Sequence, residues 1–172
     1  MKKQFLEIGK IVTTHGIKGE MKLQLWCDDA NFVKQFTLLY LDDKGENSVK
    51  LLSVRAVKND ALICLDGIDT IEKANSMRNQ ILYINRNDAN LPADFNFIQD
   101  LIDCKVVDLD SKICYGIVND VQNLGASDIY EVKQEDNKVV LIPAVKDIVK
   151  KIDTDNGVIY INAMKGLFDN EN

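Results

Sequence analysis

The residues of this chain whose types could do chemistry lie closest together in the stretch IVTTHGIKGE. It holds the only histidine, one lysine, one glutamate and two glycines: His15, Lys18, Glu20, Gly16 and Gly19. An imidazole near a carboxylate could act as a general base, and a glycine-rich loop with a lysine could bind a phosphate group. A catalytic loop, a recognition loop and a plain structural turn are the three interpretations to weigh.

The phosphate-binding interpretation fails on context. The stretch contains neither GxGxxG nor GxxxxGK[ST], and a strand pattern rather than a helix follows it. Catalysis by His15 would require a partner and an orienting group in reach, and no known spacing links it to Thr13, Thr14 or Glu20 as a triad. A recognition loop or a turn is favoured, because functional side chains collect on loops that rigid strands hold in place.

Two other groups of residues could suggest metal chemistry. The acidic doublets Asp28-Asp29 and Asp42-Asp43 stand among turn-forming residues, where Asp is common, so we interpret them as solvated turns. The four cysteines are separated by 37, 40 and 10 residues without a CxxC pair: Cys27, Cys64, Cys104 and Cys114. Buried, reduced thiols fit this spacing better than a zinc site. We therefore expect no metal, no cofactor and no catalytic residue.

Charge separates the two halves of the chain. The net charge is −6, but the first 90 residues carry 13 Lys and Arg against 12 Asp and Glu, whereas the rest carry 8 against 15. This balance excludes a protein that holds nucleic acid mainly by neutralising phosphates. The acidic second half should attract a basic partner. Local phosphate contacts remain an alternative to solvated strand faces for four cations: Lys18, Lys22, Arg55 and Lys58.

Membrane insertion and secretion have no support in the sequence. The longest uninterrupted apolar run, VVLIPAV at residues 139–145, is far shorter than the roughly 18 residues that indicate a membrane span. Glu7 and Lys10 interrupt the apolar residues near the amino terminus, so a secretory signal is not expected. We expect a cytoplasmic protein without membrane contact.

Alternation of apolar and polar residues with a period of two dominates the chain and predicts strands. The predicted strands cover residues 5–12, 21–26, 36–42, 49–57, 61–67 and 81–86, and then 104–110, 115–123, 128–135, 138–145 and 157–163. One helix is predicted in IDTIEKANSMRNQ, with Asp69 as its cap and Glu72 reaching back to it.

The alternation stops and restarts around RNDANLPADFN, residues 86–96, which is the expected linker. We therefore predict two domains, residues 1–90 and 91–172. Short strands at regular spacing indicate small barrels, so the predicted fold is all-β, with two small β-barrel domains and one or two short helices.

Several motifs, taken in order, resemble one family. IGKIVTTHGIKGEMKLQLW is similar to the opening of the RimM family of ribosome maturation factors, and LDGIDTIEKANSMRNQILYI resembles the segment that closes the family's first barrel. DLIDCKVVD, YGIVNDVQNLGASDIYEV, VLIPAV and the late GLF resemble its PRC-barrel domain. The resemblance runs from about Leu6 to Phe168, and its specificity lies in the order of the motifs.

The resemblance implies a translation-factor-like amino-terminal barrel followed by a PRC-barrel. It implies a monomeric, non-enzymatic factor that binds the immature small (30S) ribosomal subunit and assists assembly of its head domain and 16S rRNA processing. A basic ribosomal protein of the head is the implied protein partner, with rRNA backbone contact in addition. The implied partner-binding residues are His15, Gly16, Lys18, Gly19 and Glu20 in the first barrel and Phe97, Asp100, Asp128 and Pro143 in the second.

The chain departs from the family pattern at two places. Family members commonly carry two adjacent tyrosines before Asp-Leu, where this chain has Asn96 and Phe97. Asp103 stands where glycine is usual, although Asp is among the residues that tolerate a left-handed backbone. Two other functions stay as alternatives: an RNA-modifying or RNA-cleaving enzyme that uses His15, and a general β-barrel adaptor that binds proteins.

Overall fold

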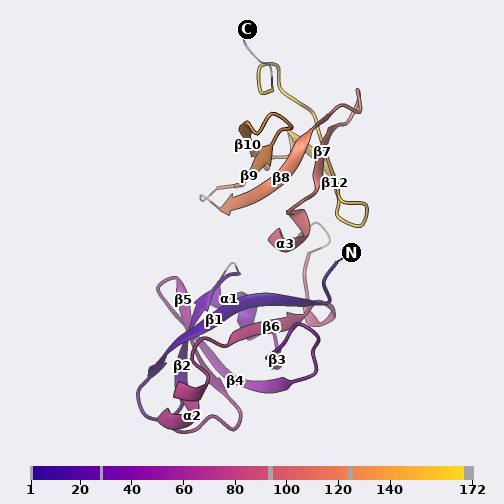
Figure 1. Cartoon of the computed structure of the whole chain (residues 1–172). Helices are drawn as coiled ribbons and strands as arrows, with labels where there is room; N and C mark the ends of the chain where they lie inside the picture. The colour runs from indigo at the N-terminus through magenta and orange to yellow at the C-terminus, as the bar shows by residue number, and fades with distance from the viewer. Residues whose placement is uncertain (1, 28, 93–94, 124–125, 169–172) are drawn as a thin grey trace. The chain divides into compact units, whose positions relative to one another are not determined.

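The computed structural model describes residues 2–27, 29–92, 95–123 and 126–168. The chain divides into two compact units, Lys3–Pro92 and Ala93–Asn172, the latter together with the first two residues. Figure 1 draws the first unit in indigo to magenta and the second in pink to yellow. Each unit is described by itself below.

The amino-terminal unit is a closed barrel with the strand order β1-β2-β5-β4-β3-β6. Its strands are β1 (Phe5–His15), β2 (Glu20–Leu25), β3 (Leu38–Tyr40), β4 (Ser48–Val57), β5 (Asp60–Leu65) and β6 (Ile81–Asn85). Alternate apolar residues of these strands point inward, and the largest fully buried ones are Leu6, Ile8, Ile11, Met21, Leu23, Leu39, Ile63, Leu65, Leu82 and Ile84. Register shifts bend β1 so that it pairs with β2 along one edge and with β6 along the other.

Short helices connect the barrel strands. They are α1 (Ala30–Lys34), α2 (Ile71–Ser76) and the 3₁₀ turn η1 (Arg86–Asp88). The prediction that Asp69 caps α2 is wrong: the side chain of Thr70 accepts the hydrogen bond from the Lys73 backbone N–H. Asp69 lies one residue before the cap, and its carboxylate instead pairs with the Lys73 ammonium at 2.6 Å. The helix therefore begins one residue later than the capping pattern indicated.

The carboxy-terminal unit is a six-stranded sheet with the order β10-β9-β8-β7-β12-β11. Its elements are α3 (Ile98–Leu101), β7 (Lys105–Asp108), β8 (Cys114–Asn123), β9 (Asp128–Lys133), β10 (Val139–Pro143), β11 (Val149–Asp153) and β12 (Val158–Ile161). The sequence pattern missed β11, because its residues VKKID lack the alternation of a half-buried strand. Leu101 of α3 joins the buried core that the sheet encloses.

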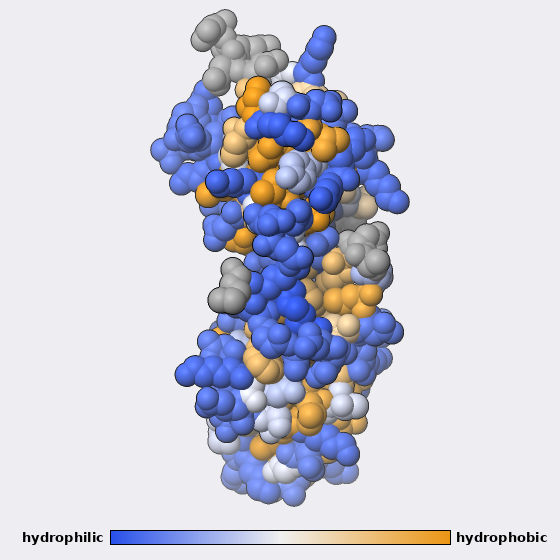
Figure 2. All heavy atoms as spheres, turned by 90° about the vertical axis from the view of Figure 1, so that its right-hand side faces the viewer, coloured by the Kyte–Doolittle hydropathy of each residue, from blue (hydrophilic) through white to orange (hydrophobic). Residues whose placement is uncertain are grey.

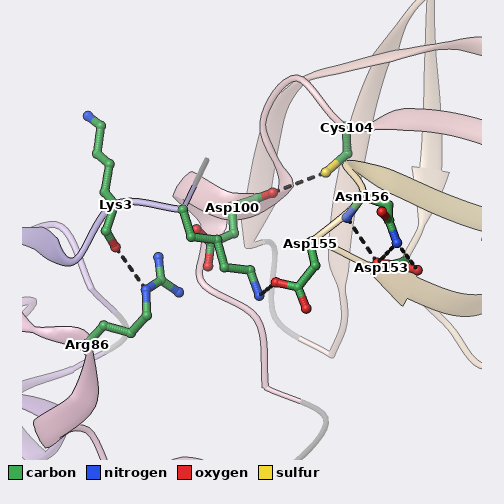
Figure 3. A network of polar contacts seen from close by, with 8 residues as sticks. Lys3, Arg86, Asp100, Cys104, Asp153, Asp155 and Asn156 are labelled. Atoms are coloured by element: carbon green, nitrogen blue, oxygen red, sulfur yellow. Dashed lines mark hydrogen bonds and ion pairs between the residues drawn. The ribbon is translucent and has the colours of Figure 1, made fainter.

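Polar contacts fix the chain near the ends of both units. In the first unit, Arg86 Nε donates to the carbonyl oxygen of Lys3 at 2.9 Å (Figure 3). In the second, Cys104 Sγ donates to the carbonyl oxygen of Asp100 at 3.1 Å, which closes the turn after α3. Asp103 in that turn has a φ of 65°, as expected for a position where the family usually has glycine. The left-handed turn is therefore kept by an aspartate.

The predicted all-β class is confirmed, with three α-helices of four to six residues in the described parts of the chain where one or two short helices were predicted. Of the two predicted barrels, the first has a closed sheet and the second is built on a six-stranded sheet. Hydrophilic side chains cover most of the face that Figure 2 shows, with hydrophobic ones between them on both units. In the described residues, no helix is long and apolar enough to cross a membrane.

Candidate functional site

The stretch around the only histidine forms the hairpin between β1 and β2. His15 is the last residue of β1 and is the register partner of Glu20, the first residue of β2. The His15 side chain is 57% exposed, and its Nε2 lies 3.7 Å from Oε1 of Glu20. The hairpin thus brings an imidazole and a carboxylate together at one end of the barrel.

Arg55 from β4 reaches the same carboxylate. Its NH2 lies 2.7 Å from Oε1 of Glu20, and its Nε lies 3.3 Å from Oε2. Strand register explains this meeting, because Lys22 of β2 and Arg55 of β4 both pair with Leu62 of the intervening strand β5. Two parallel N–H donors on two carboxylate oxygens hold Glu20 in one orientation. Sequence reasoning missed this partner, since 35 residues separate the two side chains.

This ion pair keeps Glu20 charged. The hydrogen bond from Arg55 lowers the pKa of the Glu20 carboxyl below its ordinary value, against the opposing effect of burial, and electrostatic interactions with Arg55 and then His15 lower it further. A carboxylate with a lowered pKa is a weaker base. Glu20 is therefore suited to orienting His15 and Arg55 rather than to taking a proton from a substrate.

The two glycines of the hairpin have different roles. Both have positive φ, 69° at Gly16 and 82° at Gly19. A Cβ at Gly19 would stand 2.1 Å from the carbonyl oxygen of Ile68, in the turn before α2, whereas a Cβ at Gly16 would meet nothing within 4 Å. Gly19 is a packing position, and Gly16 is needed only for its backbone conformation.

Lys18 and Ile17 form the exposed tip of this hairpin, where the Ile17 side chain is 75% exposed. Of the four cations considered for phosphate contact, two are neutralised: Lys22 pairs with Asp60 at 3.1 Å, and Arg55 pairs with Glu20. Lys18 makes no ion pair with any described residue. The hairpin tip therefore offers one unpaired positive charge beside the exposed imidazole.

The acidic doublets that could have suggested metal chemistry have local structural roles. Asp29 caps α1, with its Oδ1 accepting from the Phe32 N–H at 2.9 Å, while Asp28 lies outside the described residues. The Asp42 carboxylate accepts hydrogen bonds from the backbone N–H groups of Lys44, Glu46 and Asn47. The bond from Glu46 contributes most to lowering the pKa of Asp42 to about 2. The turn interpretation is confirmed for Asp42, whereas Asp29 is the N-cap of helix α1, which the sequence pattern did not predict. Within the described ranges, no three His, Cys, Asp or Glu side chains are grouped as metal ligands would be.

The prediction of buried cysteines holds only in part. All four thiols are free, but only Cys104 is buried, and Cys114 at the start of β8 is exposed. Burial raises the pKa of the Cys104 thiol, and the negative charges of Asp100 and Asp103 add to the effect. Cys114 directly follows the exposed turn between β7 and β8.

The remaining predicted residues all lie in the carboxy-terminal unit. Asp100 belongs to α3, and Phe97 directly precedes that helix. Asp128 begins β9, and its carbonyl oxygen accepts from the Ala144 N–H at 2.8 Å; Pro143, the residue before Ala144, ends β10. Asp128 and Pro143 are therefore close neighbours across two paired strands.

Phe97 forms an aromatic pair that sequence reasoning missed. Its ring packs edge-to-face against Phe95, with the ring centroids 5.2 Å apart. The two aromatic residues are two positions apart in the sequence, on either side of Asn96. In extended chain, residues two apart point to the same side, so the pattern Phe-Asn-Phe was the signal that could have revealed the pair.

The first unit is a closed six-stranded barrel that carries the ion-paired hairpin, and the second is built on a six-stranded sheet. The chain is therefore an all-β protein of two units. The model of the RimM N-terminal domain matches residues 6–89, and the model of the RimM PRC barrel domain matches residues 98–167. This chain belongs to the RimM family.

Individual relatives are similar over nearly their whole length. The chain is 40% identical over 164 residues to "Ribosome maturation factor RimM" of Clostridium botulinum, which covers 95% of this chain and 96% of the relative. It is 36% identical to the protein of the same name from Acetivibrio thermocellus, covering 98% of both. A crystal structure of a RimM protein from Pseudomonas aeruginosa has 25% identity and a TM-score of 0.46, covering 93% of this chain and 98% of that one.

Proposed function

We propose that this protein binds the immature small ribosomal subunit and assists assembly of its head domain and processing of 16S rRNA. The observation that carries the proposal is the match of both RimM domain models, in order, across most of the chain. The curated relatives are named as ribosome maturation factors. The protein acts as a monomer in the cytoplasm and uses no metal or cofactor.

The hairpin tip is the proposed contact with the subunit. Glu20, held by Arg55, orients His15 beside the tip, and Lys18 offers a point charge to a phosphate group. The His15 ring supplies a hydrogen bond or a stacking face. The glycines set the shape of this loop, and the side chains between and beside them make the contacts.

The acidic carboxy-terminal unit is the proposed protein-binding part. Residues 91–172 carry 8 Lys and Arg against 15 Asp and Glu, which complements a basic ribosomal protein of the head. Phe97, Asp100, Asp128 and Pro143 contribute to this surface. The near-neutral first unit then approaches RNA without strong repulsion.

Catalysis on RNA is the main alternative to consider, because the structure does place His15 close to a carboxylate, that of Glu20. However, that carboxylate is committed to Arg55, and its lowered pKa makes it a poor base. We therefore propose that the chain has no enzymatic activity. Purified protein should leave 16S rRNA precursors intact, and RNA cleavage that disappears in His15→Ala would contradict this.

The test is co-sedimentation of the full chain with immature small subunits. The double variant His15→Ala with Lys18→Ala should reduce the bound fraction at least fivefold without a change in melting temperature. Lys44→Ala is the matched control, because Lys44 also lies in an exposed hairpin turn of the barrel, between β3 and β4, makes no ion pair with a described residue and is not a candidate phosphate contact. Equal binding of the double variant and the control would mean that the hairpin is only a structural turn.

Failure of the wild-type chain to sediment with subunits would refute the function as a whole. A general protein adaptor would give that result while still binding basic proteins.

A further inference from the structure

Strand β10 (Val139–Pro143) lies at the end of the six-stranded sheet. It pairs with β9 on one side, and among the described residues no strand pairs with its other side. The sheet of this unit does not close into a continuous hydrogen-bonded barrel as that of the first unit does. An open strand edge presents unpaired backbone groups that another chain can extend.

Hydrogen-bond parity shows which residues of β10 face the open edge. Gln134 N–H donates to Lys138 O, and Ala144 N–H donates to Asp128 O, at the two ends of the pairing with β9. In an antiparallel pair, the residues that bond to the partner alternate with those that do not. The even-numbered residues of β10 therefore bond to β9, and Val139, Leu141 and Pro143 direct their backbone groups to the open edge.

Pro143 fits this parity. Proline has no backbone N–H, so within sheets it is tolerated where that N–H would face away from the ladder. At its position on β10 it costs no bond to β9 and shortens the open edge at one end. Two N–H donors, those of Val139 and Leu141, are left to pair with an added strand.

Two apolar side chains of the edge strand itself are exposed on its outer face. The side chains of Val139 and Leu141 are 50% and 51% exposed, while Ile142, which points the other way, is fully buried. Ile117 of β8, across the sheet from Val139 by way of Lys133, is 41% exposed. An added strand could therefore gain apolar contact as well as backbone hydrogen bonds.

The segment that contains β9 and β10, residues 128–147, is net acidic. Within and next to the paired strands β9 and β10 stand five acidic residues and three basic ones: Asp128, Glu131, Glu135, Asp136 and Asp147, against Lys133, Lys138 and Lys146. The ion pair of Lys138 with Asp136, at 3.3 Å, removes one charge of each sign, so the segment keeps a net charge of −2. A basic segment would meet complementary charge, and an acidic one would be repelled.

We infer that the open edge of β10 binds an extended, basic segment of a partner protein, which adds to the sheet as a strand. Its backbone pairs with Val139 and Leu141, its alternate apolar side chains lie beside those of the same two residues, and its basic side chains face the acidic surroundings. This inference rests on the proposed function only for the expectation that the partner is basic.

The probe is a capped, fluorescently labelled heptapeptide in which lysine and valine alternate, titrated into the full chain. Two matched peptides serve as controls: one with glutamate in place of lysine, and one N-methylated on every backbone amide. Each should bind at least tenfold more weakly. Heteronuclear NMR should show the Val139 and Leu141 amides protected from exchange only with the first peptide.

Two variants test the edge itself. Leu141→Pro removes one outward N–H and no bond to β9, and Leu141→Lys replaces an exposed apolar side chain. Both should weaken peptide binding at least tenfold. Ile113→Lys is the matched control, because Ile113 is similarly exposed, at 56%, but lies in the turn before β8.

Several outcomes would overturn the inference. Unchanged peptide binding in both Leu141 variants would exclude the edge, and equal binding of the acidic peptide would exclude the stated partner chemistry. Concentration-dependent dimers that Leu141→Pro abolishes would make a second copy of this chain the occupant. If wild-type protein sediments with subunits but does not bind the peptide, this inference fails while the proposed function stands. If it binds the peptide but does not sediment with subunits, the proposed function fails while this inference stands.

Discussion

The carbonyl oxygen of Ile68 occupies the space that a side chain at Gly19 would need. A Cβ on Gly19 would stand 2.1 Å from this oxygen, and 2.7 Å from the carbonyl carbon. The contact seats the β1–β2 hairpin against the turn that precedes α2. Two stretches that resemble the family separately, GIKGE and LDGIDT, are therefore parts of one packed structure.

Substitutions at the two hairpin glycines should differ in cost. Gly16→Ala meets no atom and should lose about 1 kcal/mol of stability, from the left-handed backbone alone. Gly19→Ala adds a clash with backbone, so we expect a loss of more than about 3 kcal/mol. Thermal unfolding of the full chain measures both. Equal losses would show that the Ile68 contact can relax.

The ion pair of Glu20 predicts a pH dependence. Because its pKa is lowered in the folded state, the stabilisation is fully present above the ordinary value of 4.5 and is lost as the pH falls through the folded value. Glu20→Gln should lower the melting temperature by a few degrees at pH 7, with the difference vanishing in acid. Glu72→Gln, at an exposed carboxylate of α2, is the control for the removal of one negative charge. A difference that persists at pH 3 would contradict the assignment.

The edge-to-face contact of Phe95 with Phe97 predicts that the two rings act together in binding a basic head ribosomal protein. Either Phe95→Ala or Phe97→Ala should weaken binding about fivefold to tenfold, and the double variant should lose little more, because such pairs are coupled by roughly 0.5–1.5 kcal/mol. Phe32→Ala removes one ring of an edge-to-face pair in the other unit and serves as the control. Full binding by Phe95→Ala would restrict the contact to Phe97.

The division of the chain at residue 92 predicts that each part folds alone. Fragments of residues 3–92 and 93–172 should each unfold in one cooperative transition, and their sum should reproduce the calorimetric trace of the full chain. The first fragment keeps the closed barrel, and the second keeps the core around Leu101. If neither fragment folds, the proposed domain boundary is wrong.

For the candidate site, the local sequence predicted the hairpin but not the ion pair between Glu20 and Arg55. His15, Gly16, Gly19 and Glu20 are neighbours along the chain, and their residue types favoured a tight connection between strands. Arg55 could not be assigned to Glu20, because the meeting depends on how β2 and β4 are placed across β5. The same holds for the Ile68 oxygen that makes Gly19 indispensable.

Alternating polarity along the sequence was sufficient to indicate an all-β protein and most of its strands, because burial of one strand face leaves a period of two in the residues themselves. Closure was decided only by tertiary structure: strand order and register are non-local, so the first unit closes into a barrel while the second leaves β10 as an open edge. The position of the weakly alternating strand β11 is likewise decided by tertiary structure. Its position is set by pairing with β12, which no local pattern of residues encodes.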